Sequence, residues 1–150
     1  MKKESEISVR EKTYQDITEV FGLVPTMFKH IPDDSIELEW ALFKKLQIEE
    51  TAIPNKYKEL MGIAISGATK CKYCAFYHTE LAKLNGATPE EIEDAAHFGK
   101  QTSGWSSYLN GLQIDFEEFK KEIVAACEHV RKTQEKAQTK IKRTETELTI

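Results

Sequence analysis

Apolar residues recur at helical spacing along most of the chain, and no segment alternates apolar and polar residues for more than a few positions. Residues three or four apart lie on one face of an α-helix, whereas a half-buried strand requires a period of two. One early stripe consists of Tyr14, Ile17, Val20 and Phe21 and ends at Gly22, which suits a helix C-terminus. The pattern therefore predicts an all-α fold, a compact single-domain bundle of about seven helices.

The middle of the chain carries the strongest apolar signals. A short element over residues 26–30 precedes a long helix that begins near Ser35. Its apolar stripe is expected to consist of Leu38, Ala41, Leu42 and Leu46. Pro54 and Asn55 open the next helix, in which residues 60–65 are apolar on nearly every side. We therefore expect that helix to be the most buried one.

Capping residues mark the later helices. The helix that follows Cys71 is expected to stop at Gly86, and Thr88 with Glu91 forms a capping box for the next one. A separate helix is expected near residues 102–109. Asp115 caps a last helix whose apolar side is expected to carry Phe116, Phe119, Ile123, Ala126, Cys127 and Val130. Residues 1–12 are polar and are expected to be frayed.

Length and composition indicate one domain. The chain has 150 residues, of which 40% are hydrophobic and 31% charged, an ordinary balance for a chain that buries its own core. We expect a helical domain over residues 1–130, followed by a charged extension over residues 131–150 that is either helical or disordered.

Charge and hydropathy exclude several classes of function. The formal net charge is −4, which argues against a nucleic-acid-binding protein because that role needs a concentrated basic face. No apolar run approaches the length of a membrane span, and the basic N-terminus lacks the apolar stretch of a signal peptide. We therefore expect a cytoplasmic protein without membrane association. No glycine-rich phosphate loop is present, and we expect no cofactor.

The residues that carry chemistry lie between Glu59 and His78. Cys71 and Cys74 form a C-x-x-C pair, and His78 follows four residues later. If this segment is helical, both sulfurs and the imidazole share one face, with the sulfurs in the first turn. The unpaired N–H groups there favour the reactive thiolate. Glu59, on the preceding helix, can orient the imidazole or carry its proton to bulk solvent. The pattern predicts a dithiol redox site.

Other interpretations of these residues remain open. Glu59 and His78 can be solvated surface residues, and Cys71, Cys74 and His78 can bind zinc with Glu59 or His97 as the fourth ligand. Structural zinc sites usually add a second ligand pair from a distant turn, and this chain has no other such pair, so we expect no metal. Cys127 is expected to be a small buried hydrophobe that stays reduced.

The chain resembles the carboxymuconolactone decarboxylase and alkylhydroperoxidase D-like superfamily over roughly residues 24–123. The resemblance rests on the motif E-x(11)-C-x-x-C-x-x-x-H and on the segment Gly86-Ala-Thr-Pro-Glu-Glu91. The resemblance implies a trimer or hexamer that reduces peroxides or disulfides. It also implies that Cys74 attacks peroxide, that Cys71 is its partner, and that Glu59 and His78 relay protons. Peroxidases of the redox-active branch of this superfamily carry a second histidine immediately before the second cysteine, where this chain has Tyr73.

Three functions compete. The first is a thiol-dependent peroxidase or disulfide reductase that takes electrons from a dithiol donor such as a lipoyl protein or a peroxiredoxin. The second is a lyase of the same superfamily, in which Glu59 and His78 perform acid–base chemistry and the cysteines are incidental. The third is a non-enzymatic redox-sensing or binding module. Loss of two reactive thiols on mild peroxide treatment separates the first from the second, and repeated turnover separates it from the third.

Overall fold

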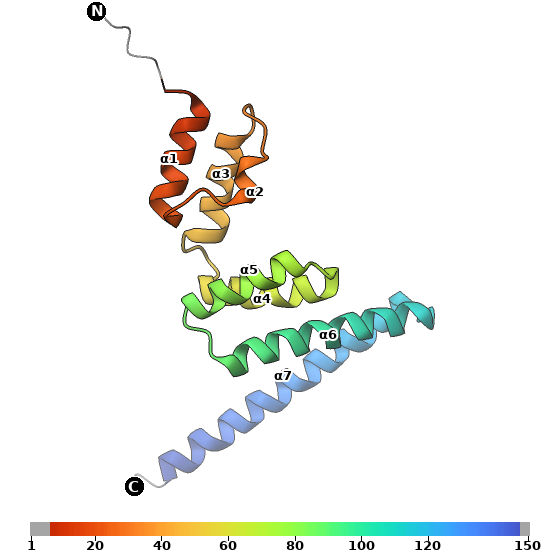
Figure 1. Cartoon of the computed structure of the whole chain (residues 1–150). Coiled ribbons are helices and arrows are strands. Elements are labelled where there is room, and N and C mark those ends of the chain that lie inside the picture. Colours follow the sequence, from red (N-terminus) through yellow and green to blue (C-terminus); the bar gives the residue numbers. More distant parts are fainter. Residues whose placement is uncertain (1–6, 148–150) are drawn as a thin grey trace, which may run out of the picture. The chain divides into compact units, whose positions relative to one another are not determined.

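A computed structural model describes residues 7–147 of the chain and the side chains of residues 7–139. These residues form helices joined by short connections, without strands in the described part (Figure 1). The elements are α1 (Val9–Phe21), α2 (Thr26–Lys29), α3 (Ile36–Phe43), the π-helical turn η1 (Lys44–Ile48), α4 (Asn55–Thr69), α5 (Lys72–Leu84), α6 (Pro89–Gly111) and α7 (Phe116–Glu147). The predicted all-α fold is confirmed.

The predicted caps are present. Gly22 ends α1 in the left-handed region with φ 74°, a conformation that glycine adopts without steric strain. Thr88 and Glu91 exchange both bonds of a capping box before α6. Asp115 accepts the backbone N–H of Glu118 at 2.7 Å at the start of α7. Local side-chain chemistry therefore sets the ends of these helices.

Several predicted boundaries are wrong. Residues 9–12 are helical rather than frayed, because Ser8 and Glu11 form a capping box that starts α1. The helices expected on either side of residue 100 are one continuous helix, α6. Residues 1–6 of the polar N-terminus and residues 148–150 of the charged extension lie outside the described residues.

The apolar core lies among α1, α2 and α3. Its buried members are Ile17, Phe28, Ile36 and Trp40, and the rings of Phe21 and Phe43 pack around them. The stripe expected on α3 is wrong, since Leu38 is 73% exposed and Leu42 is 55% exposed. α3 instead buries the opposite stripe, because that face carries the larger ring of Trp40.

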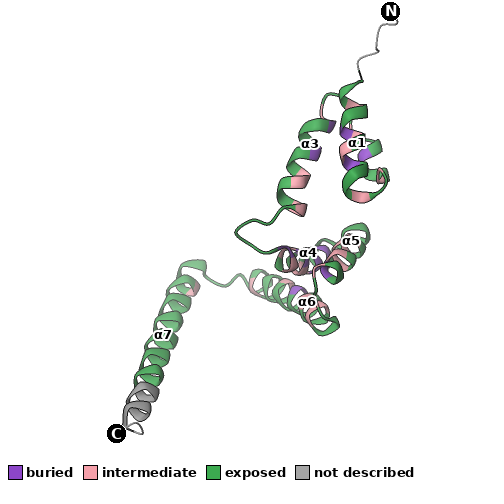
Figure 2. Ribbon diagram, turned by 90° about the vertical axis from the view of Figure 1, so that its left-hand side faces the viewer, coloured by how far each residue is buried: buried purple, intermediate pink, exposed green. Residues whose placement is uncertain are grey.

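α4 and α5 form the second packed pair and lie side by side in both views (Figures 1 and 2). The buried side of α4 is mostly polar or small and consists of Asn55, Glu59, Gly62, Ile63 and Ser66. The expectation that this helix is the most buried one is confirmed, since α4 has more buried residues than any other described helix, although Met61 and Ile65 are exposed. The buried side of α4 holds chemistry-bearing residues where a bundle would normally hold aliphatic ones.

The chain divides into two compact units, residues 1–101 and residues 102–150, with the boundary inside α6. In the second unit, α7 includes residues 131–147 of the charged segment and buries none of its described side chains. Cys127 is exposed, so the expectation that it is buried is wrong for this chain. None of the described helices is long and apolar enough to cross a membrane.

Candidate active site

A tight connection between α4 and α5 positions the two cysteines. Lys70 ends α4 in the left-handed region with φ 57°, and the N–H of Cys71 then donates to the carbonyl of Ser66 at 3.0 Å. This bond reverses the chain within two residues of the last turn of α4. Cys71 becomes the N-cap of α5, and its Sγ accepts the backbone N–H of Cys74 at 3.2 Å. A sulfur thus occupies the acceptor position that an oxygen usually fills.

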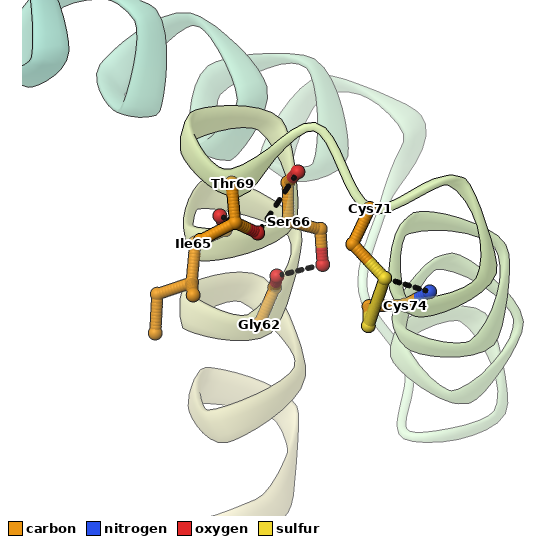
Figure 3. The surroundings of a disulfide bond; sticks show 6 residues. All are labelled: Gly62, Ile65, Ser66, Thr69, Cys71 and Cys74. Carbon is orange, nitrogen blue, oxygen red and sulfur yellow. Dashed lines mark hydrogen bonds between the residues drawn. A yellow bond between two sulfur atoms is a disulfide. The ribbon is translucent and has the colours of Figure 1, made fainter.

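Cys71 and Cys74 are joined by a disulfide across this first turn, with their Cα atoms 5.4 Å apart (Figure 3). Cys74 is exposed and Cys71 is half-buried. Ser66, whose hydroxyl donates to the carbonyl of Gly62 at 2.6 Å, lies on the side of α4 that faces the bridge (Figure 3). Cys74 is therefore the more exposed residue of the pair.

His78 and Glu59 form a bonded pair between the two helices. Nδ1 of His78 lies 2.7 Å from Oε2 of Glu59. The side chain of Glu59 is 0% exposed and that of His78 is 19% exposed. A buried carboxylate is costly unless it is paired, and the imidazole is its pairing group. The bond also orients the ring, so that Nε2 is the nitrogen left for a substrate or a thiol.

Gly62 makes room for the imidazole. A Cβ atom at this position would lie 2.4 Å from Cγ and Nδ1 of His78, closer than real Cβ atoms approach other heavy atoms. Gly62 lies one turn after Glu59 on the same side of α4, so the ring packs against bare backbone while it reaches the carboxylate. The sequence pattern did not predict a role for this glycine. The signal for it was its spacing, three residues from Glu59.

Tyr77 adds a second buried polar group beside this pair. Its ring meets that of His78 edge to face, with centroids 5.1 Å apart. Burial raises the pKa of the Tyr77 phenol, and the negative charge of Glu59 raises it further. The phenol therefore stays protonated at neutral pH. Its O–H group can donate a hydrogen bond, and its oxygen can accept one. Tyr77, like Gly62, was missed by the sequence analysis, because a tyrosine beside a histidine has no distinctive spacing.

The four predicted site residues thus come together on α4 and α5, with the bridge at one end and the Glu59–His78 pair one to two turns away. Contact between His78 and a thiol stays a prediction.

Tyr73, at the position of the family's second histidine, is 77% exposed and lies under the ammonium group of Lys72. His97 lies elsewhere, in an open groove between α4 and α6. Within the described residues, no group of three or more histidine, cysteine or acidic side chains is placed to hold a metal ion.

An all-helical chain with a cysteine pair at a helix start and a buried glutamate–histidine pair defines a recognisable class of protein. The sequence model of the carboxymuconolactone decarboxylase family matches residues 36–115, more than half of the chain. The chain belongs to this family.

The chain is also similar to a solved structure and to a curated protein. The fold matches the crystal structure of the alkylhydroperoxidase AhpD core from Rhodospirillum rubrum, with a TM-score of 0.65 and 22% identity, over 73% of this chain and 83% of that one. A Paracoccus denitrificans protein described as uncharacterized protein 4 in cox locus is 25% identical over 76 residues, which are 51% of this chain and 68% of that protein. The structural match bears on the fold alone.

Proposed function

We propose that this protein is a dithiol oxidoreductase, a thiol-dependent peroxidase or disulfide reductase. Cys71 and Cys74 form its redox couple, and His78 and Glu59 relay protons. The observation that carries the proposal is the Cys71–Cys74 bridge at the accessible start of α5, on the same two helices as a buried acid–base pair. Membership of a family that includes enzymes supports a related activity.

In the reaction with a peroxide, the reduced protein supplies both electrons. The thiolate of Cys74 attacks one peroxide oxygen and the O–O bond breaks. The departing alkoxide takes a proton, which His78 delivers from Nε2, and leaves as an alcohol. Cys74 is then a sulfenic acid. The exposure of Cys74 supports this assignment, because the attacking sulfur must reach the substrate.

Resolution forms the bridge. The sulfur of Cys71 attacks the sulfenic sulfur of Cys74, the S–O bond breaks, and the hydroxide leaves as water after taking the proton from Cys71. A dithiol donor then reduces the bridge by thiol–disulfide exchange, becomes a disulfide itself and returns two protons to the protein thiols. The same couple reduces a disulfide substrate when the first attack falls on sulfur instead of oxygen.

The environment of the bridge suits this cycle. Cys71 accepts a backbone N–H at the N-terminus of α5, and such donors stabilise the negative charge that a reduced sulfur carries. Glu59 is bonded to the ring nitrogen that does not face the substrate, so it can take up or release a proton as His78 changes its charge. Each group in the cycle has a defined position on α4 or α5.

A lyase is the second candidate, and the description of the matched family favours it. In a lyase of this kind, Glu59 and His78 would perform acid–base chemistry and the cysteines would be incidental. Substitution of the cysteines separates the two candidates, because a lyase keeps its rate without Cys74.

A homo-oligomer, a trimer or a hexamer, is the proposed assembly. Tyr73, Phe76 and Leu84 are each more than 70% exposed on α5, and a monomer rarely leaves large apolar side chains together in solvent. Size-exclusion chromatography with light scattering tests this proposal. A single species of about 17 kDa at micromolar concentration would contradict it.

The test of function is a turnover assay with hydrogen peroxide, an organic hydroperoxide and a small disulfide, each with a panel of dithiol donors. The parent protein is expected to turn over repeatedly with at least one pair. Cys74→Ser is expected to abolish turnover, and Cys127→Ser is the matched control that retains it. Oxidation of the parent once without further turnover would instead indicate a sensor, and full activity of Cys74→Ser would remove the thiol mechanism.

A further inference from the structure

The environment of the second oxygen of Glu59 is the starting point. Oε2 bonds His78, whereas Oε1 is buried without a hydrogen-bond partner among the described residues. The hydroxyl of Tyr77 is the other buried side-chain atom in the described part of the chain that lacks a partner. Buried polar atoms are almost always bonded, so a pair of such atoms calls for an explanation.

The two atoms are complementary. The raised pKa of Tyr77 keeps its hydroxyl protonated, so it is a donor, while a carboxylate oxygen is an acceptor. Tyr77 directly precedes His78 in α5, and its ring contacts the imidazole that Glu59 binds. Two buried groups of this kind, both without a hydrogen-bond partner among the described residues, form the setting in which one buried water makes both bonds.

We propose that Tyr77 is a positioning residue of the proton relay, linked through one bridging water to Oε1 of Glu59. This inference rests on the proposed function, because the proton relay is part of that function. The NMR measurement that tests it does not require the protein to be active. The phenol holds the carboxylate in place from one side while His78 holds it from the other, so that Oε2 stays directed at the imidazole.

Other charged groups near α4 are engaged elsewhere. On α4 itself, Lys56 pairs with Glu91 of α6 at 2.6 Å, and Lys58 donates to Asn55 and to the carbonyl of Glu49. In η1, Lys44 pairs with Asp16 and Lys45 with Glu49. On α5, the titratable groups that interact with Glu59 are His78 and Tyr77. The groups of α6 on the groove side of α4 that titrate are Glu91, Asp94 and His97.

The experiment compares Tyr77→Phe with Tyr73→Phe in the disulfide form of the full chain. Both variants remove one phenolic oxygen from α5, but Tyr73 is exposed and Tyr77 is not. Carbon-13 NMR at pH 7 measures the chemical shift of the Glu59 carboxyl carbon. This chemical shift is expected to change in Tyr77→Phe, because the hydrogen bond to Oε1 is lost. It is expected to stay at the parent value in Tyr73→Phe.

Activity supplies a second readout. If the protein turns over peroxide, Tyr77→Phe is expected to move the acidic limb of its pH–rate profile to higher pH. An unchanged carboxyl chemical shift in Tyr77→Phe would overturn the proposal, and so would a rate loss of equal size at every pH. The NMR measurement needs no turnover. A changed carboxyl signal in Tyr77→Phe but not in Tyr73→Phe, in a protein without redox activity, would therefore support the role of Tyr77 while the proposed function fails.

Discussion

The core of α1, α2 and α3 and the interface of α4 and α5 are built on opposite principles. The first buries Ile17, Phe28, Ile36 and Trp40, and the indole N–H of Trp40 donates to Asp16 at 2.8 Å. The second buries a carboxylate and a glycine beside a half-buried imidazole, and one oxygen of that carboxylate has no hydrogen-bond partner among the described residues. Apolar burial stabilises the fold, whereas burial of an ionisable pair opposes it.

One region therefore stabilises the fold, and the other carries the candidate chemistry. Glu59 and His78 can be kept buried because other parts of the fold supply the apolar contacts that stabilise it. A substitution in the aromatic core should therefore change the free energy of unfolding more than the chemistry of the folded protein. A substitution at the α4–α5 interface should do the reverse.

The largest effect on stability is expected from Trp40→Ala. The side chain is 2% exposed and packs against three neighbouring rings, so its removal should lower the free energy of unfolding by about 3–5 kcal/mol. Chemical denaturation measures the change. Leu38→Ala, on the exposed side of the same helix, should cost less than about 0.5 kcal/mol. Equal losses in the two variants would refute the placement of the core.

Gly62→Ala should disturb the site most for the smallest change in volume. The new methyl group would overlap the imidazole, which has to leave the carboxylate, so we expect a loss of about 1–3 kcal/mol and a slower reaction at pH 7. Gly67→Ala is the matched control, since nothing lies within 4 Å of its Cβ position on the same helix. It should be neutral or stabilising by up to about 1 kcal/mol. Denaturation and His78 NMR signals measure both variants.

The sequence predicted the fold better than it predicted burial. The cysteine, histidine and glutamate spacing selected four residues that the structure brings together on α4 and α5, because those residue types have few other uses in that order. The apolar pattern failed on α3, where Leu38 and Leu42 are exposed, because leucine marks a possible core position without choosing between two faces of a helix. Gly62 and Tyr77 could not be predicted, since their roles depend on contacts across two helices.

A smaller effect is expected from Asp16→Asn. Hydrogen bonds from Lys44 first and Trp40 second lower the pKa of Asp16. A depressed pKa in the folded state contributes stability that is present above the ordinary aspartate range, near pH 4, and is lost as the pH falls through the lower folded value. Both side chains of the ion pair are partly exposed, so the loss at pH 7 should not exceed about 1 kcal/mol. Denaturation at pH 7 and pH 2.5 should show the difference between parent and variant disappearing in acid.

The smallest effect is expected from Cys127→Ser. Cys127 is exposed on α7, and its replacement should change the free energy of unfolding by no more than about 0.5 kcal/mol. Mass mapping after mild peroxide treatment should find the Cys71–Cys74 bridge in both proteins. A major bridge that contains Cys127 in the parent would break the assignment of the redox pair.

The relay itself is tested most directly by the rate at which hydrogen peroxide oxidises the reduced protein, measured for the parent and for His78→Ala at pH 7 and pH 9. A thiol of ordinary pKa, near 8.5, is mostly protonated at pH 7, so removal of the proton relay should slow oxidation there by about tenfold or more. At pH 9 the thiol ionises without help and the difference should narrow. Glu59→Gln should show the same dependence on pH. Identical profiles for the parent and His78→Ala would contradict the account.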